Sequence, residues 1–455
     1  MRIALALFAA LLCACGGPSE CKLDDPKSCS TGQVCEAVTG RAKPLCFKPV
    51  QVKGTVTSQA DGKPVSGAEV IATDELGTPA GTKATSASDG TYVLPIPSTR
   101  SDEKGTVAGR KVLLRASAQD FEAFPGSVRV SLPIDTSKAT HNPSDGPWLV
   151  QSPLTDIALV PVADIKKGRP GIIGSVALPA NTTALVVAEG VETFTALADQ
   201  SGDFHLFNVA PGHYSVQAYT KGFNFTAATV DVVSSDVTGV SIAQAGTAST
   251  QVPGKVQLVA GANNAGTSVV LAVESTFVSA LGRGEVPPGL RTPDFGIAPD
   301  ITGDFTLHGV PDGKYVLLAA FENDDNVRDP DPNIGGTQIP HLTVTNGAVT
   351  PTGISIKVTG AILMNGPGAD GSVEPVSSTV TFGWHAYPSA STYAVQVYNS
   401  TGTKVWEQQS VSGTTVQYNG PALTTGQVYQ WRATAYGNNS NPISTTEELR
   451  GLFAP

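Results

Sequence analysis

Two short segments decide the fold class of this chain: residues 201–206 (SGDFHL) and residues 209–216 (VAPGHYSV). Glycine and aspartate favour tight turns, because both take positive φ readily. Around these turns apolar residues alternate with polar ones, which is the pattern of a strand with one buried face. We therefore expect a β-hairpin here. The side chains expected on its buried face are Phe204, Leu206, Tyr214 and Val216.

The pattern recurs along the chain. It returns at residues 302–307 (TGDFTL) and 310–317 (VPDGKYVL), again with ten residues from the phenylalanine to the tyrosine, and a partial copy stands at residues 88–97. Short alternating strands between turn residues predict an all-β fold of tandem antiparallel β-sandwiches. Each copy has an opening strand, at 54–56, 174–176 or 254–256, and a second strand, at 68–72, 184–188 or 268–273.

A known family shares details of these copies. Residues 54–56 (GTV), 62–70 (GKPVSGAEV) and 89–92 (DGTY) resemble the carboxypeptidase regulatory-like domain, a transthyretin-like (prealbumin-like) β-sandwich that is also grouped with carbohydrate-binding-like folds. The resemblance implies non-catalytic modules that serve as spacers, adhesive units or sugar-binding domains. The modules expected from it span residues 50–164, 165–245 and 246–360.

The last segment, residues 372–455, differs in composition and holds three of the four tryptophans. Alternating strands are expected at residues 382–384 and 393–398. Residues 423–433 resemble a fibronectin type III strand entered through a tyrosine corner, with Tyr429 as the corner residue. The segment is therefore expected to form a fibronectin type III-like, Ig-like sandwich.

The three tryptophans of this segment have different expected places. Trp384 and Trp431 lie on predicted strands and are expected in the sandwich core. Trp406 stands in the charged stretch 404–407 (KVWE) and is expected to be partly exposed, where it could stack against a sugar ring.

The N-terminus carries an export signal. Residues 3–12 are an unbroken apolar run, too short to cross a hydrocarbon core that needs about 20 helical residues. The adjoining residues 12–17 (LCACGG) resemble the lipobox of bacterial lipoproteins. The resemblance implies a signal peptide at residues 1–14 and a diacylglycerol thioether on Cys15, usually with an N-acyl chain such as palmitate. Gly16, in place of a retaining aspartate, favours the outer membrane; the alternative is an ordinary cleaved signal peptide.

Four further cysteines form one local unit within residues 15–49. They are Cys21, Cys29, Cys35 and Cys46, and no cysteine follows them. In an exported chain such a set predicts two disulfides, with three pairings open. Zinc is the alternative, although the Cys-x-x-Cys pairs typical of zinc sites are missing. Residues 29–35 resemble the Cys-rich modules near the mature ends of some bacterial surface lipoproteins.

Motifs of catalytic chemistry are missing from the sequence. None of the six histidines stands in a His-x-x-Glu or His-Glu-x-x-His pattern, and there is no Gly-x-Ser-x-Gly elbow or phosphate-binding loop. Thr306 and Lys314 replace His205 and His213 in the next copy, which indicates solvent-facing positions. Acidic residues outnumber basic ones by 39 to 29, so nucleic acid is not an expected partner. We expect a protein that is not an enzyme.

One stretch concentrates negative charge, with five carboxylates in residues 322–331. Ca²⁺ binds six to eight oxygens, and residues 329–333 have the Asp-x-Asp-x-Asn spacing of a calcium loop, although Pro340 stands where an EF-hand has its bidentate glutamate. The alternative is a solvated loop stiffened by proline. Structural calcium is thus the one cofactor that the sequence suggests. The candidate ligands are Glu322, Asp324, Asp325, Asp329, Asp331 and Asn333.

These features together predict a lipid-anchored protein of the cell envelope, held at the outer membrane, with no nucleic-acid partner. Its sandwiches are expected to bind a surface protein or a polysaccharide, or to space such a site from the membrane. An exported hydrolase or metal-dependent enzyme is the alternative, with residues such as His341 or His385 brought near the acidic loop by folding.

Overall fold

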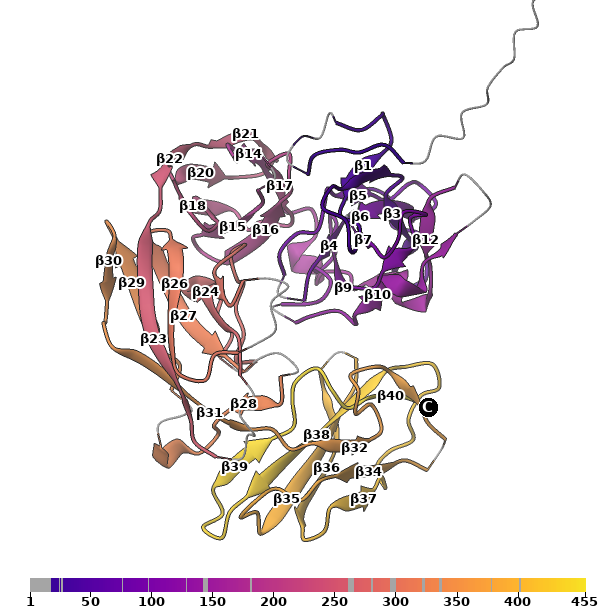
Figure 1. Cartoon of the computed structure of the whole chain (residues 1–455), viewed down its shortest axis with the longest axis vertical. Helices are drawn as coiled ribbons and strands as arrows, with labels where there is room; N and C mark the ends of the chain where they lie inside the picture. Colours follow the sequence, from indigo (N-terminus) through magenta and orange to yellow (C-terminus); the bar gives the residue numbers. More distant parts are fainter. Residues whose placement is uncertain are drawn as a thin grey trace, which may run out of the picture. The chain divides into compact units, whose positions relative to one another are not determined.

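The computed structural model describes residues 18–23, 25, 28–75, 77–96, 98–127, 129–141, 146–180, 182–260, 266–279, 281–294, 300–320, 324–334, 338–377, 379–400 and 402–455. The chain is nearly all β, with 49% strand and 4% helix, as the all-β prediction requires (Figure 1). In the described residues the helical segments are short 3-10 turns, and none could span a membrane. The chain divides into two compact units, of which the first is residues up to Arg169 with Pro179–Thr182 and Asp199–Ser201.

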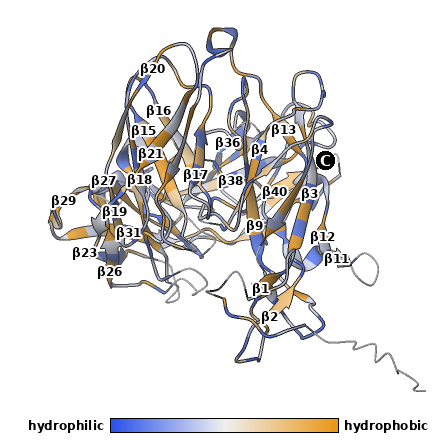
Figure 2. Ribbon diagram, turned by 90° about the horizontal axis from the view of Figure 1, so that it is seen from above, coloured by the Kyte–Doolittle hydropathy of each residue, from blue (hydrophilic) through white to orange (hydrophobic). Residues whose placement is uncertain are grey.

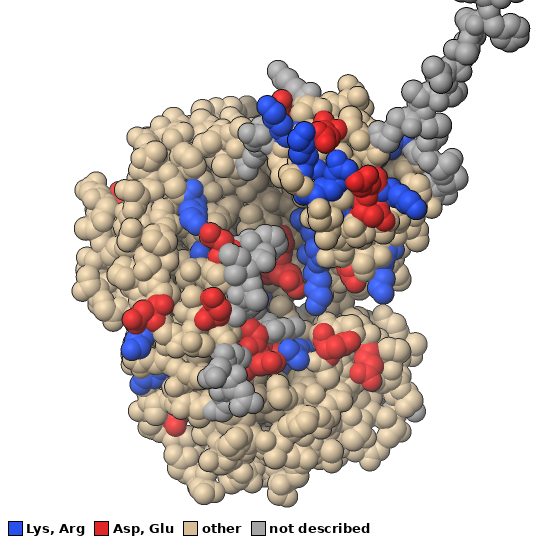
Figure 3. Space-filling view, viewed as in Figure 1, with Lys and Arg blue, Asp and Glu red and all other residues tan. Residues whose placement is uncertain are grey.

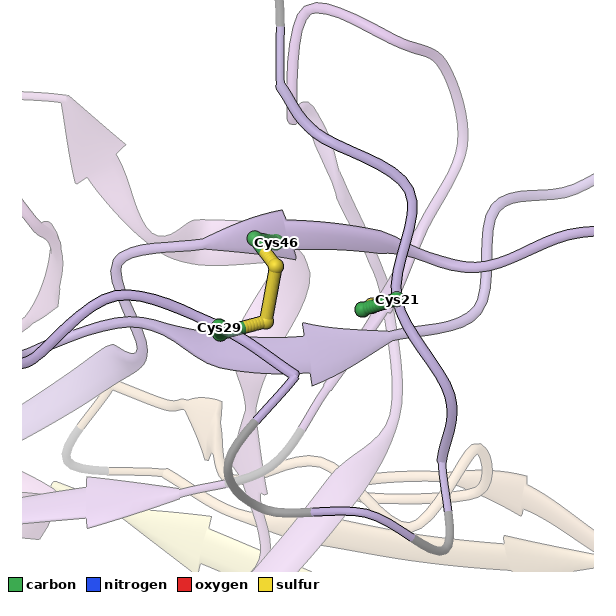
Figure 4. Close-up of side chains that lie close together, drawn as sticks. All are labelled: Cys21, Cys29 and Cys46. Carbon is green, nitrogen blue, oxygen red and sulfur yellow. A yellow bond between two sulfur atoms is a disulfide. The ribbon is translucent and has the colours of Figure 1, made fainter.

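The first unit begins with the disulfide-bonded segment. Cys21 is bonded to Cys35. Cys29 is bonded to Cys46 (Figure 4). The two disulfides are therefore confirmed and their pairing is decided. The zinc alternative is contradicted, because a bonded sulfur offers no thiolate to a metal. The segment's two strands, β1 (Val34–Glu36) and β2 (Leu45–Phe47), pair antiparallel and bring Cys35 opposite Cys46.

A buried ion pair fixes this segment to the first sandwich. Glu36, at the end of β1, pairs with Arg100 of the two-stranded sheet β7 (Thr99–Arg100) and β8 (Val107–Ala108). Arg100 also donates to the carbonyls of Gly105 and Lys48, each at 2.8 Å. Both charged side chains are buried. The Cys-rich segment is therefore packed against the sandwich and is not joined to it by a flexible linker alone.

Three sandwiches in succession share one plan. In each, the opening strand pairs antiparallel with one strand and parallel with a strand late in the sandwich, while the second strand lies in the facing sheet. The expected opening and second strands are all confirmed. Figure 2 shows how polar and apolar residues mix along these strands, as expected for sheets with one buried face.

The first sandwich has sheets β11-β12-β3-β13, with β6 also on β3, and β10-β9-β4-β5. Its elements are β3 (Val50–Ser58), β4 (Glu69–Thr73), β5 (Ala84–Thr85), β6 (Thr91–Ile96), β9 (Lys111–Ser117), β10 (Ile134–Asp135), η1 (Thr136–Lys138), β11 (Thr140–His141), β12 (Trp148–Val150), η2 (Pro153–Thr155), β13 (Ile157–Leu159) and η3 (Asp164–Lys166).

The second sandwich has sheets β17-β14-β21 and β16-β15-β18-β20, beside a small β19-β22 sheet. Its strands are β14 (Ile172–Val176), β15 (Ala184–Glu189), β16 (Thr193–Ala198), β17 (Asp203–Leu206), β18 (Gly212–Tyr219), β19 (Phe223–Phe225), β20 (Ala228–Val232), β21 (Val237–Ile242) and β22 (Gln244–Thr247).

The third sandwich has sheets β26-β23-β31-β28 and β25-β24-β27-β29-β30. Its elements are β23 (Thr250–Leu258), β24 (Val269–Val273), η4 (Glu274–Thr276), β25 (Arg291–Thr292), β26 (Asp304–Val310), β27 (Gly313–Ala319), β28 (Asn326–Arg328), η5 (Pro332–Ile334), β29 (His341–Thr345), β30 (Ala348–Thr350) and β31 (Ile354–Gly360).

The repeated motif is not a hairpin, contrary to expectation. β17 pairs with β14, whereas β18 pairs with β15 and β20 in the facing sheet. The segment between them crosses from one sheet to the other, and its Val209 and Ala210 are buried. The four predicted core side chains do share one core, because residues of two facing sheets point toward each other.

The crossing is held by the tyrosine that follows it. The Tyr214 hydroxyl donates to the carbonyl of Ala210, and the Tyr315 hydroxyl donates to the carbonyl of Pro311, each at 2.9 Å. Both hydroxyls are buried with their rings, so the bonds satisfy groups that water cannot reach. The second and third sandwiches therefore each have a tyrosine corner, which was expected at Tyr429 only, whereas in the first sandwich the Tyr92 hydroxyl donates to the distant carbonyl of Thr155.

The fourth sandwich packs sheet β32-β34-β37 against sheet β33-β40-β38-β35-β36, with β39 on β38. The Tyr429 hydroxyl accepts from the Thr424 backbone N–H at 3.0 Å, which confirms that corner. Its strands are β32 (Met364–Gly366), β33 (Glu374–Pro375), β34 (Thr381–Trp384), β35 (Thr392–Tyr398), β36 (Lys404–Val411), β37 (Thr415–Gln417), β38 (Tyr429–Tyr436), β39 (Pro442–Thr445) and β40 (Leu452–Ala454).

The tryptophans of this sandwich all lie in its core. Trp384 and Trp431 are 1% and 0% exposed, as predicted. Trp406 is only 9% exposed, so the prediction of partial exposure is wrong. Its ring packs 5.2 Å from that of Tyr418, and its Nε1 donates to Asn419 at 2.8 Å. No ring face is left for a sugar, and the stacking role is dropped.

Candidate functional site

The acidic loop was the main candidate site, and its described residues lie at the end of the third sandwich, from Asp324 to Asn333. Glu322 lies outside the described residues. The Asp324 carboxylate accepts from the Thr267 hydroxyl at 2.6 Å, and that of Asp331 accepts from the Asn333 backbone N–H at 2.9 Å. Asn333 itself is exposed.

Among the described carboxylates of the loop, Asp329 is the most buried, at 3% exposure. It accepts from the backbone N–H of Asp331 at 2.8 Å, as in a proline-stiffened turn. Burial raises the pKa of Asp329, and the neighbouring Asp331 carboxylate adds to the shift. This carboxylate thus accepts a hydrogen bond from the protein's own backbone.

The loop carboxylates do not converge. Among the described residues, the one set of three His, Cys, Asp or Glu side chains close enough to share a metal ion is Cys21, Cys29 and Cys46, which are all disulfide-bonded. The described part of the loop thus lends no support to the calcium hypothesis. It stays a prediction, and an unchanged melting temperature on adding calcium to chelator-treated protein would remove it.

The loop instead meets the fourth sandwich. The backbone N–H of Asp325 donates to the Glu447 carboxylate, and its own carboxylate lies 3.2 Å from Nη2 of Arg450. Arg450 also forms an ion pair with Glu447 through Nε. Next to this cluster, Arg283 of the third sandwich pairs with Glu448 at 2.6 Å. We call these five residues the acidic joint: Arg283, Asp325, Glu447, Glu448 and Arg450.

Glu447 is the buried centre of the acidic joint, with 2% of its surface exposed. Burial raises the pKa of its carboxyl to about 7, and the nearby Asp324 and Asp325 carboxylates add to the shift, while Arg450 and the Asp325 N–H oppose it. The joint therefore holds one carboxyl that titrates near neutral pH. No sequence pattern indicates this carboxyl, because Glu447 is 122 residues from Asp325 along the chain.

A second joint links the second and third sandwiches. The backbone N–H of Gly222 donates to the carbonyl of Gly309 at 2.7 Å, and Lys221 pairs with Asp294 at 2.9 Å. Gly309 has a φ of 70°, and a Cβ on it would lie 3.1 Å from the Gly222 nitrogen. The two sandwiches are therefore in backbone contact at this joint.

The histidines do not build a site with the acidic loop. His213 is exposed, as expected, and pairs with Asp231 on the neighbouring strand. His205 is half-buried against Phe207, so its expected solvent-facing position is only partly correct. His341 pairs with Glu274 at 2.6 Å, and His385 is exposed on the fourth sandwich. In the described residues neither joins the loop carboxylates in a metal-sized set.

No family model matches the chain, and no curated protein matches it. Solved structures with some likeness include the Bacillus anthracis TIE protein (13% identity, 87% of this chain and 70% of that one, TM-score 0.15). Others are the minor pilin GBS52 of Streptococcus agalactiae (14%, 44% and 99%, TM-score 0.18) and a DUF3823 family protein from Bacteroides ovatus (13%, 45% and 98%, TM-score 0.19). TM-scores this low carry no argument about function.

Proposed function

We propose that this protein is a non-enzymatic scaffold of the bacterial cell surface, lipid-anchored at Cys15 in the outer membrane. Its carboxypeptidase regulatory-like and fibronectin type III-like sandwiches carry a binding site for a surface protein or polysaccharide. One observation carries the proposal: the last three sandwiches are joined by fixed contacts, at Gly222–Gly309 and at the acidic joint. Flexible linkers would not need such contacts.

The joints suit a scaffold because they fix the position of one sandwich relative to the next. Backbone hydrogen bonds and buried ion pairs hold neighbouring domains in one arrangement, whereas small polar interfaces leave domains mobile. A site on the last sandwich would then keep a defined orientation to the second and third sandwiches. The exported hydrolase remains the second candidate, but no described constellation of catalytic groups favours it.

The Cys-rich segment suits the base of such a scaffold. Two disulfides cross-link the segment internally, and the Glu36–Arg100 ion pair ties it to the first sandwich. Lipid on Cys15 would act only a few residues before Cys21, so the first sandwich would be held near the membrane. Two or three acyl chains give lasting attachment where one does not.

The anchor is tested by comparing the wild-type chain with Cys15→Ala in the producing bacterium. We expect the wild-type chain in the outer-membrane fraction, accessible to protease on intact cells, with a lipid mass on its N-terminal peptide. The Cys15→Ala chain should leave that fraction. An unmodified N-terminus on the native chain would contradict the anchor.

The joints are tested by limited proteolysis of the folded Cys15→Ala chain. We expect the connections near residues 219–226 and 358–364 to resist cleavage at protease levels that trim exposed loops, because local opening there would break backbone hydrogen bonds. Early cleavage at either connection would show freely moving domains and would contradict a scaffold with fixed joints.

A further inference from the structure

The fourth sandwich has a surface chemistry unlike the rest of the chain. Residues 372–455 contain 22 serines and threonines and 11 asparagines and glutamines, but only seven charged residues. Three of those seven belong to the acidic joint: Glu447, Glu448 and Arg450. In Figure 3, few charge colours appear in the lower part of the view, where Figure 1 draws the fourth sandwich. A surface of this kind offers hydrogen bonds without a net charge.

The outer face of the large sheet gathers polar side chains in register. On the central strand β35, Gln396 stands opposite Arg432 of β38 and opposite Glu407 of β36. One step along the same face, Tyr398 stands opposite Gln430. The alternate residues of these strands are buried in the core, so this set points away from it. The polar face is defined by Gln396, Tyr398, Glu407, Gln409, Gln430 and Arg432.

These side chains are held in place before any ligand arrives. The Tyr398 hydroxyl donates to Gln396 Oε1 at 2.6 Å, and Gln396 Nε2 donates to Glu407 Oε1 at 2.9 Å. Gln409 and Lys404 also bond to Glu407, and these hydrogen bonds lower its pKa to about 2. Side chains that are already ordered lose less conformational entropy on binding. The polar face is therefore preorganised.

The charge of the polar face selects the class of partner. Lys404 neutralises Glu407, which leaves Arg432 as the remaining charged group of the set. Arg432 is half-buried, and its Nε finds no acceptor among the described residues. That Nε is itself enclosed, so Arg432 could reach a ligand only through its terminal nitrogens. The fixed amides and the tyrosine ring of the face complement sugar hydroxyls and the apolar face of a pyranose. A strongly charged polymer would find no complementary electrostatic potential on this face.

We propose that the polar face of the fourth sandwich binds a neutral polysaccharide. This proposal rests on the scaffold function above and names the ligand class of its distal binding site. Gln396, Tyr398 and Arg432 are the residues expected to hydrogen-bond the sugar hydroxyls, with Tyr398 also packing against a ring. The second and third sandwiches then position the site instead of binding.

The test is affinity gel electrophoresis of the Cys15→Ala chain through gels that contain dextran, a mannan or a soluble β-glucan, with alginate as the anionic probe. We expect retardation by at least one neutral polymer. Gln396→Ala and Tyr398→Phe should each weaken it roughly tenfold, whereas Gln417→Ala, exposed on the opposite sheet, should leave it unchanged. Unchanged melting temperatures separate lost binding from lost folding.

Three results would overturn the proposal: no retardation by any of the neutral polymers, retardation by alginate only, or equal retardation of the wild-type chain and both polar-face variants. The scaffold function fails separately, by the N-terminal mass and protease experiments. A chain that binds mannan but carries no lipid keeps the binding site and loses the anchor.

Discussion

Gly254 of β23 lies directly opposite Phe305 of β26, and the phenylalanine ring fills the space where a side chain at residue 254 would project. A Cβ on Gly254 would lie 2.3 Å from Cζ of Phe305. Gly174 likewise lies opposite Phe204, and Gly54 opposite Tyr92. There a Cβ would first meet a backbone oxygen, that of Val240 at 2.1 Å or that of Thr155 at 2.0 Å, and then the aromatic side chain. The glycine of each opening strand is thus required by close neighbours, and at Gly254 that neighbour is the ring.

Gly254→Ala is expected to destabilise the protein by about 1–3 kcal/mol, because the new methyl must displace a ring packed in the core. Urea unfolding followed by circular dichroism measures the change. Gly303→Ala is the matched control, since a Cβ there would meet nothing within 4 Å. Equal stabilities of the two variants would show that the ring moves aside without cost.

Tyr315→Phe is expected to cost about 1–2 kcal/mol, because the Pro311 carbonyl loses its donor at a site that is 0% exposed. The ring and its packing stay. Tyr214→Phe should have a similar effect through the Ala210 carbonyl. Thermal unfolding of both variants checks the prediction, and a wild-type melting temperature in either would mean that the corner hydroxyl contributes nothing there.

Glu447 should make stability fall between mildly acidic and neutral pH. Its folded pKa of about 7 exceeds the ordinary 4.5, so the native state keeps a proton that the unfolded chain has lost. The stabilisation is therefore complete below pH 4.5 and is lost as the pH rises through 7, by at most about 3 kcal/mol.

Glu447→Gln should flatten this part of the pH profile, measured by urea unfolding at a series of pH values from 4.5 to 8. The neighbouring Glu448→Gln serves as the control, because Glu448 keeps 31% of its side chain exposed in its pair with Arg283. A profile that stays as steep in Glu447→Gln as in the wild-type chain would assign the titration to other groups.

Arg100→Met is expected to destabilise the first unit by about 3–5 kcal/mol, because Glu36 would remain buried without its cation. Arg41→Ala removes only exposed ion pairs with Glu20 and Glu103 and should change stability by less than about 1 kcal/mol. Calorimetry of the oxidised protein distinguishes the two. A small loss in Arg100→Met would mean that Glu36 takes up a proton at little cost.

The sequence predicted which residues are buried better than it predicted which strands pair with each other. Phe204, Leu206, Tyr214 and Val216 all lie in the core, but on two facing sheets and not on one hairpin. Alternation reports that one side of a strand is apolar, and it is the same for a hairpin as for a crossing between sheets. Which strand pairs with which depends on contacts far apart in the sequence.

For Trp406 the prediction of burial itself was wrong. Its charged neighbours Lys404 and Glu407 suggested exposure, yet these two pair with each other on the outer face while Trp406 points into the core. Successive side chains of a strand point to opposite faces, so a tryptophan beside charges can be fully enclosed. The local sequence could not tell which of the two faces was covered.

The amino-acid sequence by itself determined the all-β class, the strands that open each repeat and the oxidation of the four cysteines, because turn residues, alternation and cysteine spacing are local properties. Only the tertiary structure decided the crossing between sheets, the pairing of the cysteines, the enclosure of Trp406 and the meeting of Asp325 with Glu447 and Arg450. These four features depend on which separate strands pack against one another. Packing and burial over the whole sandwich decide that arrangement.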